Sequence, residues 1–209
     1  MIVSTLNRLR AEGRIPQDIP VYVDSPMALR AWEVYRLAVK GRDPQLRSDV
    51  DVAALEWRNH VIAAVDRTES ERLNRPTYPS IVVSASGMAT GGRVLHHLRE
   101  QLPESRNSVI LTGFQVPGTR GQELADGAHQ VKIQGRYVPV RAEIVSLRGF
   151  SAHADGSQLL QWTSGLSAPG ATYVVHGEPA ASAALADRLR ESRGWTAVVP
   201  RHLERVRLD

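Results

Sequence analysis

The sequence contains no cysteine among its 209 residues. This absence excludes disulfide scaffolds, thiol nucleophiles and thiolate metal sites. The chain also lacks a run of about 18 uncharged apolar residues, so no membrane-spanning helix is predicted. Its first ten residues already include Arg8 and Arg10 and contain no apolar signal-peptide core. Together these features lead us to expect a cytoplasmic protein without membrane contact.

Several catalytic motifs are absent as well. No H-x-H-x-D-H cluster and no H-E-x-x-H pair occurs, so the chain by itself does not supply the usual zinc shell. The phosphate-loop pattern G-x-x-x-x-G-K-[ST] and the dinucleotide pattern G-x-G-x-x-G are also missing. These absences argue against a nucleotide-binding α/β module.

The composition is that of a folded protein with a basic excess. Apolar residues make up 42% of the chain and charged residues 23%, enough for a core and too apolar for a disordered chain. The 26 basic and 22 acidic residues leave a net charge of +4, with an isoelectric point near 9.8. Arginine forks suit phosphate groups, but an arginine-rich genome explains the same excess. Charge therefore leaves nucleic-acid binding open.

Short apolar segments alternate with small-residue loops and helical patterns over the first 120 residues. The expected strands are 19–23, 80–84 and 108–112, and the expected helices are 5–12, 27–37, 52–65 and 94–102. This alternation predicts an α/β fold with a doubly wound, mostly parallel sheet flanked by helices. Ligands of such sheets bind outside the carboxyl ends of the strands. Those ends are 24–25, 84–88 and 112–118, and Asp24–Ser25–Pro26 is also a helix-start signature, with an N-cap candidate and a proline in the first turn.

The pattern changes near residue 130. Residues 130–133 and 137–145 alternate apolar and polar residues across Gln134–Gly135–Arg136, which predicts a β-hairpin. The elements expected beyond it are helix 157–166, strand 172–175, helix 180–191 and strand 197–200. We therefore predict two domains, 1–136 and 137–209.

Two histidines stand out because each follows an apolar strand and lies in a small-residue loop. His153 occurs in Gly-Phe-Ser-Ala-His-Ala-Asp, and His176 in Val-Val-His-Gly-Glu-Pro. Such positions suit a metal ligand or a general acid, although a histidine bonded to loop backbone fits equally. Asp155 and Glu178, two residues further on, are expected to cap the following helices.

A loop rich in glycine and serine, residues 84–92, precedes a predicted helix. Small residues let backbone N–H groups approach a phosphate, and the helix start adds positive potential. A tight structural turn is the alternative. The candidate phosphate-binding residues are Ser84, Ser86, Gly87, Met88, Gly91, Gly92 and, from a second glycine-containing loop at 113–121, Arg120. The other histidines, His60, His96, His97, His129 and His202, receive no role.

Five segments together resemble the β-CASP group of metallo-β-lactamase-fold nucleases, which includes RNase J-like enzymes and the nuclease subunit of the cleavage and polyadenylation factor. They are Val-Tyr-Val-Asp-Ser-Pro-Met-Ala (21–28), Ser-Ala-Ser-Gly-Met-Ala-Thr-Gly-Gly (84–92), Leu-Thr-Gly-Phe-Gln-Val-Pro-Gly-Thr-Arg-Gly (111–121), Gly-Phe-Ser-Ala-His-Ala-Asp (149–155) and Val-Val-His-Gly-Glu (174–178). They follow the order of the family and span nearly the whole chain.

The resemblance implies a zinc-dependent ribonuclease with a β-CASP domain followed by the carboxyl-terminal segment of a metallo-β-lactamase αββα fold. It places His153 on the general acid and His176 on a ligand of one of two zinc ions. The implied partners are RNA and the amino-terminal metallo-β-lactamase half, with a homodimer as a further expectation.

The main departure is the missing zinc cluster, which lies upstream of Val21 in the family, where this chain has 20 residues. The sequence thus looks like the carboxyl-terminal half of such a nuclease. We expect weak or absent zinc binding and no RNA hydrolysis by this chain alone. The alternative is a non-catalytic RNA-binding or scaffold subunit.

Overall fold

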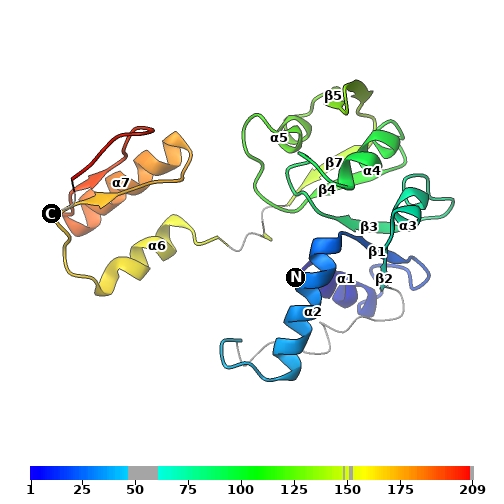
Figure 1. The fold of residues 1–209 in the computed structure, drawn as a ribbon, viewed down its shortest axis with the longest axis horizontal. Helices are drawn as coiled ribbons and strands as arrows, with labels where there is room; N and C mark the ends of the chain where they lie inside the picture. The colour runs from blue at the N-terminus through cyan, green and yellow to red at the C-terminus, as the bar shows by residue number, and fades with distance from the viewer. Residues whose placement is uncertain (47–60, 148, 151–152, 208–209) are drawn as a thin grey trace. The chain divides into compact units, whose positions relative to one another are not determined.

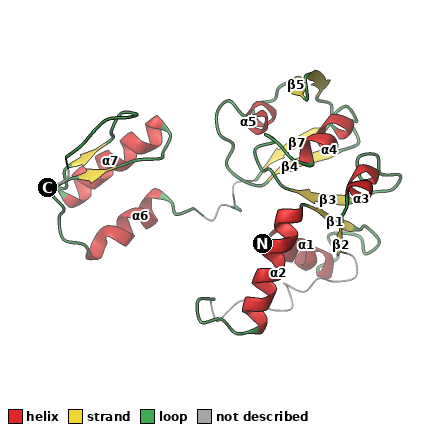
Figure 2. Ribbon diagram, in the orientation of Figure 1, coloured by secondary structure: helices red, strands yellow, loops and turns green. Residues whose placement is uncertain are grey.

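The computed structural model describes residues 1–46, 61–147, 149–150 and 153–207. The chain folds as two compact units, Met1–Ser151 and Ala152–Asp209, and each has a hydrophobic core of its own. Figure 2 shows helices and strands interspersed in both units. Within the described ranges, no helix is long and apolar enough to cross a membrane.

The larger unit opens with α1 (Ile2–Ala11) and a three-stranded parallel sheet in the order β2-β1-β3. The central strand β1 (Val21–Asp24) pairs with β2 (Val61–Ala63) on one side and with β3 (Ile81–Ser84) on the other. This is the predicted arrangement, in which neighbouring strands are parallel and are connected through helices. The sheet buries Val21, Val23 and Val61 against the first two helices, with Val3, Leu6, Leu29 and Trp32 among the contacts.

The start of α2 (Pro26–Lys40) follows the local sequence closely. The hydroxyl of Ser25 accepts a hydrogen bond from the Ala28 backbone N–H at 3.2 Å, and Pro26 occupies the first turn, where its missing N–H costs nothing. These contacts confirm the helix start predicted at residues 24–26. They also fix the direction in which the chain leaves the end of β1.

The second half of this unit is built around a second core. Its elements are α4 (Val94–Gln101), β4 (Ser108–Leu111), α5 (Arg120–Ala125), β5 (Gln130–Ile133), β6 (Arg136–Pro139) and β7 (Glu143–Ser146). Strand β4 pairs in parallel with β7, and β5 pairs with β6 as an antiparallel hairpin. Leu98, Leu102, Leu124 and Ile133 are buried between them. Figure 1 shows α4 and α5 lying over β4 and β7.

Two predicted elements differ from the structure, and one helix of the structure was not predicted. The helix predicted at 52–65 is wrong for its last residues, because Val61–Ala63 forms strand β2, in which Val61 is buried beside β1. The first part of that prediction, 52–60, lies outside the described residues. The polar stretch 66–79 contains a short helix, α3 (Arg67–Arg72), started by a capping box between Asp66 and Glu69. The hairpin arm expected at 137–145 ends at Pro139, and the chain then joins β4 as β7.

The smaller unit contains two helices and a pair of short parallel strands. Its elements are α6 (Gly156–Trp162), the 3-10 turn η2 (Thr163–Gly165), β8 (Thr172–Tyr173), α7 (Pro179–Arg193) and β9 (Ala197–Val198). Helix α7 begins with Pro179 and ends at Arg193, and the following Gly194 has a φ of 66°, a left-handed conformation that glycine adopts without strain. The core of the smaller unit contains Val174, Ala186, Leu189 and Trp195.

The predicted α/β class with parallel strands and flanking helices is therefore confirmed. The described parallel strands are divided among three sheets rather than one. Since β7 pairs with β4, residues beyond the proposed boundary at 136 pack into the larger unit.

Candidate functional site at the strand ends

The carboxyl end of β1 carries a buried carboxylate that three side chains contact. Asp24 has no solvent exposure, and its Oδ2 atom accepts hydrogen bonds from Ser70 Oγ and His97 Nε2, each at 2.6 Å. Its Oδ1 atom accepts from Arg93 Nη1 at 2.6 Å. The arginine also donates to the carbonyl oxygens of Ala64 and Val65. This cluster, which we call the Asp24 network, ties the ends of β1 and β2 to α3 and α4.

The pKa values in the Asp24 network follow from burial and hydrogen bonding. Burial disfavours the ionised form of Asp24, but the hydrogen bonds from Ser70, Arg93 and His97 outweigh it, so the pKa of this carboxyl lies below its ordinary value. Burial lowers the pKa of His97 more than the neighbouring carboxylate raises it. His97 is therefore a neutral ring that donates from Nε2, while its buried Nδ1 has no partner in the described part of the chain.

We expect the larger unit to lose stability as the pH falls from 7 toward 5. The unfolded His97 ring takes up a proton near its ordinary pKa of 6.5, whereas the folded ring, with its lowered pKa, takes one up only at a lower pH. The unfolded state then binds more protons, so the free energy of unfolding rises with pH across this window. His97→Gln should flatten this part of the profile in urea unfolding, and His129→Gln, a change at an exposed histidine, should not. An unchanged slope in His97→Gln would contradict this origin.

The predicted phosphate loop, residues 84–92, lies directly beside the Asp24 network. Ser84 ends β3, and its hydroxyl donates to the Asp24 backbone oxygen at 3.0 Å. Within the loop, Ser86 Oγ accepts from the Thr90 backbone N–H at 3.2 Å, and both Ser86 and Ala89 have positive φ values of 59° and 52°. Non-glycine residues rarely adopt this conformation, and it clusters at functional sites.

Several backbone N–H groups of this loop have no hydrogen-bond acceptor among the described residues, those of Gly87, Met88, Gly91 and Gly92 among them. The loop carbonyls, in contrast, are used: Gly87 O accepts from Gln115 Nε2 and Met88 O from the Gly121 backbone N–H, each at 3.0 Å. Unpaired N–H donors in a small-residue loop can bind an anion.

The second loop, 113–121, holds the first in place. A Cβ atom at Gly121 would lie 1.7 Å from Gln115 Oε1 and 3.1 Å from Met88 Cα, so only glycine permits this close approach. Arg120 donates to the carbonyl oxygens of Lys132, Ala89 and Thr90. These contacts tie Arg120 to the first loop. Its role in binding phosphate stays a prediction.

The two histidines singled out from the sequence lie in the smaller unit, and both are exposed. His176 follows β8 and has a φ of 66°, a conformation that costs a non-glycine residue free energy. His153 precedes Asp155, which is the N-cap of α6 and accepts from the Ser157 and Gln158 backbone N–H groups at 2.8 Å each. The cap predicted for Asp155 is confirmed. Glu178 occupies the N-cap position of α7, but its side chain makes no capping hydrogen bond.

A zinc site is not formed by the residues whose placement is described. No group of three or more histidine, aspartate or glutamate side chains gathers there in a way that could hold a metal ion. His176 alone does not satisfy the four-coordinate shell that zinc prefers. The described residues of this chain therefore do not fit a zinc ion by themselves.

Sequence reasoning missed the Asp24 network. His97 received no role, and Asp24 was placed only at a strand end and in a helix-start signature. One signal was available: a lone aspartate at the end of a buried apolar strand must be paired to stay ionised. Its partners Ser70, Arg93 and His97 lie 46 to 73 residues away in the sequence. No local pattern connects residues at that separation.

The fold and these loops define a parallel α/β protein with a candidate anion site at its strand ends. Residues 1–124 match the family description "Beta-Casp domain", and residues 137–200 match "Zn-dependent metallo-hydrolase RNA specificity domain". The chain therefore belongs to the β-CASP family of RNA-processing nucleases, as the resemblance implied. The second description indicates zinc use in the family.

Relatives with known names support this assignment. The chain is 37% identical to the ribonuclease TTHA0252 of Thermus thermophilus over 166 residues, which is 79% of this chain and 38% of the relative. It is 32% identical to an RNase J-like protein of Methanocaldococcus jannaschii over 177 residues, 85% of this chain and 40% of the relative. A transcription termination factor, FttA of Pyrococcus abyssi, is 29% identical over 136 residues, 62% of this chain and 21% of the relative. The chain thus spans about two fifths of the first two relatives.

Proposed function

We propose that this chain is the β-CASP and RNA-specificity part of a zinc-dependent ribonuclease that cleaves RNA phosphodiesters once a metallo-β-lactamase half completes it. The observation that carries the proposal is the loop at 84–92, whose unpaired N–H donors are held at the strand ends beside the Asp24 network. The family match supplies the reaction class. The proposed domains are 1–136 and 137–209, and the proposed location is the cytoplasm.

Within this proposal the two exposed histidines have separate roles. His153 donates a proton to the leaving oxygen, and His176 is one zinc ligand that the metallo-β-lactamase half would complement. Their exposure in the smaller unit is compatible with contact to a partner or a substrate. The division of labour rests on the family resemblance. The alternative function, a non-catalytic RNA-binding or scaffold subunit, uses the same loop without the hydrolytic step.

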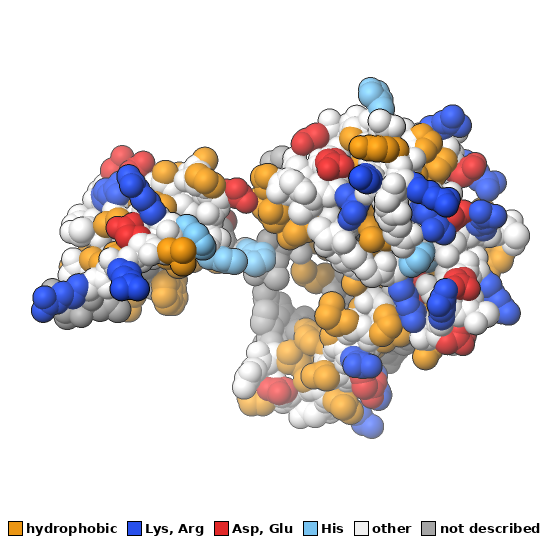
Figure 3. Space-filling view, turned by 45° about the horizontal axis from the view of Figure 1, so that its top comes forward, with side chains coloured by type: hydrophobic (Ala, Val, Ile, Leu, Met, Phe, Trp, Pro, Cys, Tyr) orange, Lys and Arg blue, Asp and Glu red, His pale blue; other side chains and the backbone are white. Residues whose placement is uncertain are grey.

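The basic excess of the chain is not sufficient by itself to explain RNA binding. Figure 3 shows lysine and arginine side chains gathered on one side of the larger unit, with acidic side chains among them. In this proposal the N–H groups of the loop at 84–92 therefore contribute to RNA binding. Contacts with phosphate groups, from whichever donor, make the affinity depend on salt.

We expect this chain to bind single-stranded RNA weakly and with strong salt dependence. Contact with about three phosphates would lower affinity roughly 20-fold between about 50 and about 200 mM salt, because counterions are released on binding. Arg120→Ala should weaken binding alike for different sequences. If Arg120 contacts a phosphate, the log–log salt slope should also fall by about 0.7; an unchanged slope would mean that it only supports the loop.

The measurement is fluorescence anisotropy with a labelled oligonucleotide at four salt concentrations. Arg106→Ala is the matched control, because Arg106 is exposed and has no described partner in the larger unit. Binding that does not depend on salt, or no binding at low salt, would count against the loop as a phosphate cradle.

A further inference from the structure

The larger unit contains a cavity that is lined by residues that the proposed reaction does not use. Its volume is about 740 Å³, within the range of about 300–1,000 Å³ typical of small-molecule sites. Its walls come from the outward side of β1 and β2, from α3, from the segment 73–80 that leads to β3, and from the end of α4. The residues used below are Tyr22, Tyr78, Arg72, Asn74 and Glu100, together with Ile62 as part of the apolar wall.

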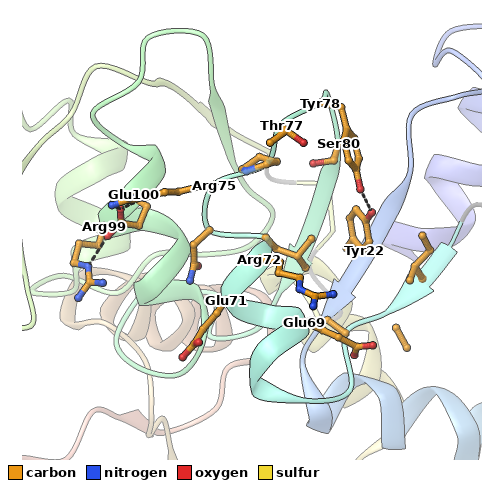
Figure 4. A pocket seen from close by; sticks show the side chains of 16 residues that line it. Tyr22, Glu69, Glu71, Arg72, Arg75, Thr77, Tyr78, Ser80, Arg99 and Glu100 are labelled. Atoms are coloured by element: carbon orange, nitrogen blue, oxygen red, sulfur yellow. Dashed lines mark hydrogen bonds and ion pairs between the residues drawn. The ribbon is translucent and has the colours of Figure 1, made fainter.

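Two tyrosines form a fixed aromatic wall on one side of this pocket. The hydroxyl groups of Tyr22 and Tyr78 lie 2.5 Å apart, and Figure 4 shows the two side chains meeting at these groups. Tyr22 is held in β1, and the hydrogen bond with Tyr78 raises its pKa to about 12, so the Tyr22 hydroxyl stays protonated at neutral pH. Tyr78 is 52% exposed, which leaves a ring face for a planar ligand.

The charged residues of the pocket are paired, with one exception. The Glu69 carboxylate accepts from the Val65 backbone N–H, and Glu71 pairs with Arg67. On the other side, Glu100 pairs with both Arg75 and Arg99. Figure 4 shows Arg75 turned toward Glu100.

Arg72 is the exception, because its guanidinium has no hydrogen bond or ion pair within the described part of the chain. In the view of Figure 4 it lies between the Glu100 pairs and the tyrosines. A free guanidinium beside an aromatic wall can bind a phosphate next to a stacked ring.

A buried acceptor provides an independent sign of a missing partner. Asn74 lines the pocket, and its Oδ1 atom, which is shielded from solvent, accepts no hydrogen bond from any described residue. Leaving such an acceptor unpaired costs free energy that a donor on a ligand would recover. An amide oxygen of this kind suits the exocyclic amine or ring N–H of a nucleobase.

We infer that this pocket binds a single nucleotide unit, with its base against Tyr78 and Tyr22, its polar edge at Asn74 and its phosphate at Arg72. Exposed Ile62 of the edge strand β2 extends the apolar wall. The pocket lies off the flank of the sheet, between α3 and the segment 73–80, whereas the phosphate loop follows the carboxyl end of β3. The unit can come from an RNA chain or from a free mononucleotide, and the test separates these sources. The inference does not require the ribonuclease reaction.

The test uses calorimetric titration of the whole chain with two probes, AMP and an adenosine RNA octamer. Both should bind, and Arg72→Gln and Tyr78→Ala should each weaken AMP binding about 10-fold or more, as expected for loss of a charge contact or a stacked base. Tyr78→Phe keeps the ring and should retain AMP affinity within about 2-fold of the unmodified protein. Arg106→Gln is the control for loss of one positive charge elsewhere.

The outcomes separate the pocket from the proposed function. A parallel loss of octamer affinity in the pocket variants assigns the site to an RNA chain, whereas loss of AMP affinity alone assigns it to a free nucleotide. AMP binding with no RNA binding at any salt would support the pocket and contradict the RNA-binding part of the proposed function. If AMP does not bind, or binds equally well to Arg72→Gln and Tyr78→Ala, the inference is overturned while the proposed function stands.

Discussion

Replacement of Asp24 by alanine is expected to lower the free energy of unfolding of the larger unit by about 3–5 kcal/mol at pH 7. Removing one partner of a buried ionic cluster leaves the remaining groups without compensation. Arg93 and His97 would lose their acceptor, and Ser70 would lose the contact that joins α3 to the sheet. None of the exposed ion pairs among the described residues has a comparable expected effect, since such pairs contribute at most about 1 kcal/mol.

Urea unfolding followed by circular dichroism measures this change. Asp18→Ala is the matched control, because Asp18 is an exposed aspartate and substitutions at such surface positions usually stay within about 0.5 kcal/mol. A loss below about 1 kcal/mol for Asp24→Ala would show that the network contributes no more than a surface pair.

The second large effect is expected at the two exposed histidines once the chain is joined to a metallo-β-lactamase half. His153→Ala should keep zinc and RNA binding and lose turnover by about 10²–10⁴-fold, as expected when a general acid is removed. His176→Ala should lose zinc together with turnover, because a ligand is removed and the affinity of the site depends on its full donor set.

Zinc analysis by atomic absorption and single-turnover cleavage of labelled RNA distinguish the two variants. His202→Ala, a change at an exposed histidine of the same unit, serves as the control and should retain both properties. Loss of zinc in His153→Ala, or full zinc and activity in His176→Ala, would show that the roles are assigned wrongly.

The sequence predicted those parts of the fold that depend on local signals. The start of α2 followed from Ser25 and Pro26, and the cap of α6 from Asp155. The parallel order of β1 and β3 followed from apolar segments separated by a helix. The two helix caps depend on residues within one turn of one another.

The errors occurred where tertiary pairing decides the structure. Val61–Ala63 carries a helical pattern with the residues before it, yet it forms a strand because β1 offers a parallel edge. Strand β7 is not part of the hairpin, because it pairs with β4. Ser108 of β4 lies opposite Glu143 of β7, and the two residues are 35 positions apart in the sequence. In the candidate site, the loop at 84–92 could be located from its small residues. The Asp24 network could not, because its members meet only in the folded chain.

The most direct test of the account is single-turnover cleavage of labelled single-stranded RNA by this chain alone and by the chain joined to a metallo-β-lactamase half that carries the H-x-H-x-D-H cluster. The account predicts no cleavage by the chain alone and zinc-dependent cleavage by the joined protein, with loss of the reaction in EDTA. A joined protein that is folded, contains zinc and binds RNA but does not cut it would contradict the ribonuclease function and favour the non-catalytic RNA-binding subunit.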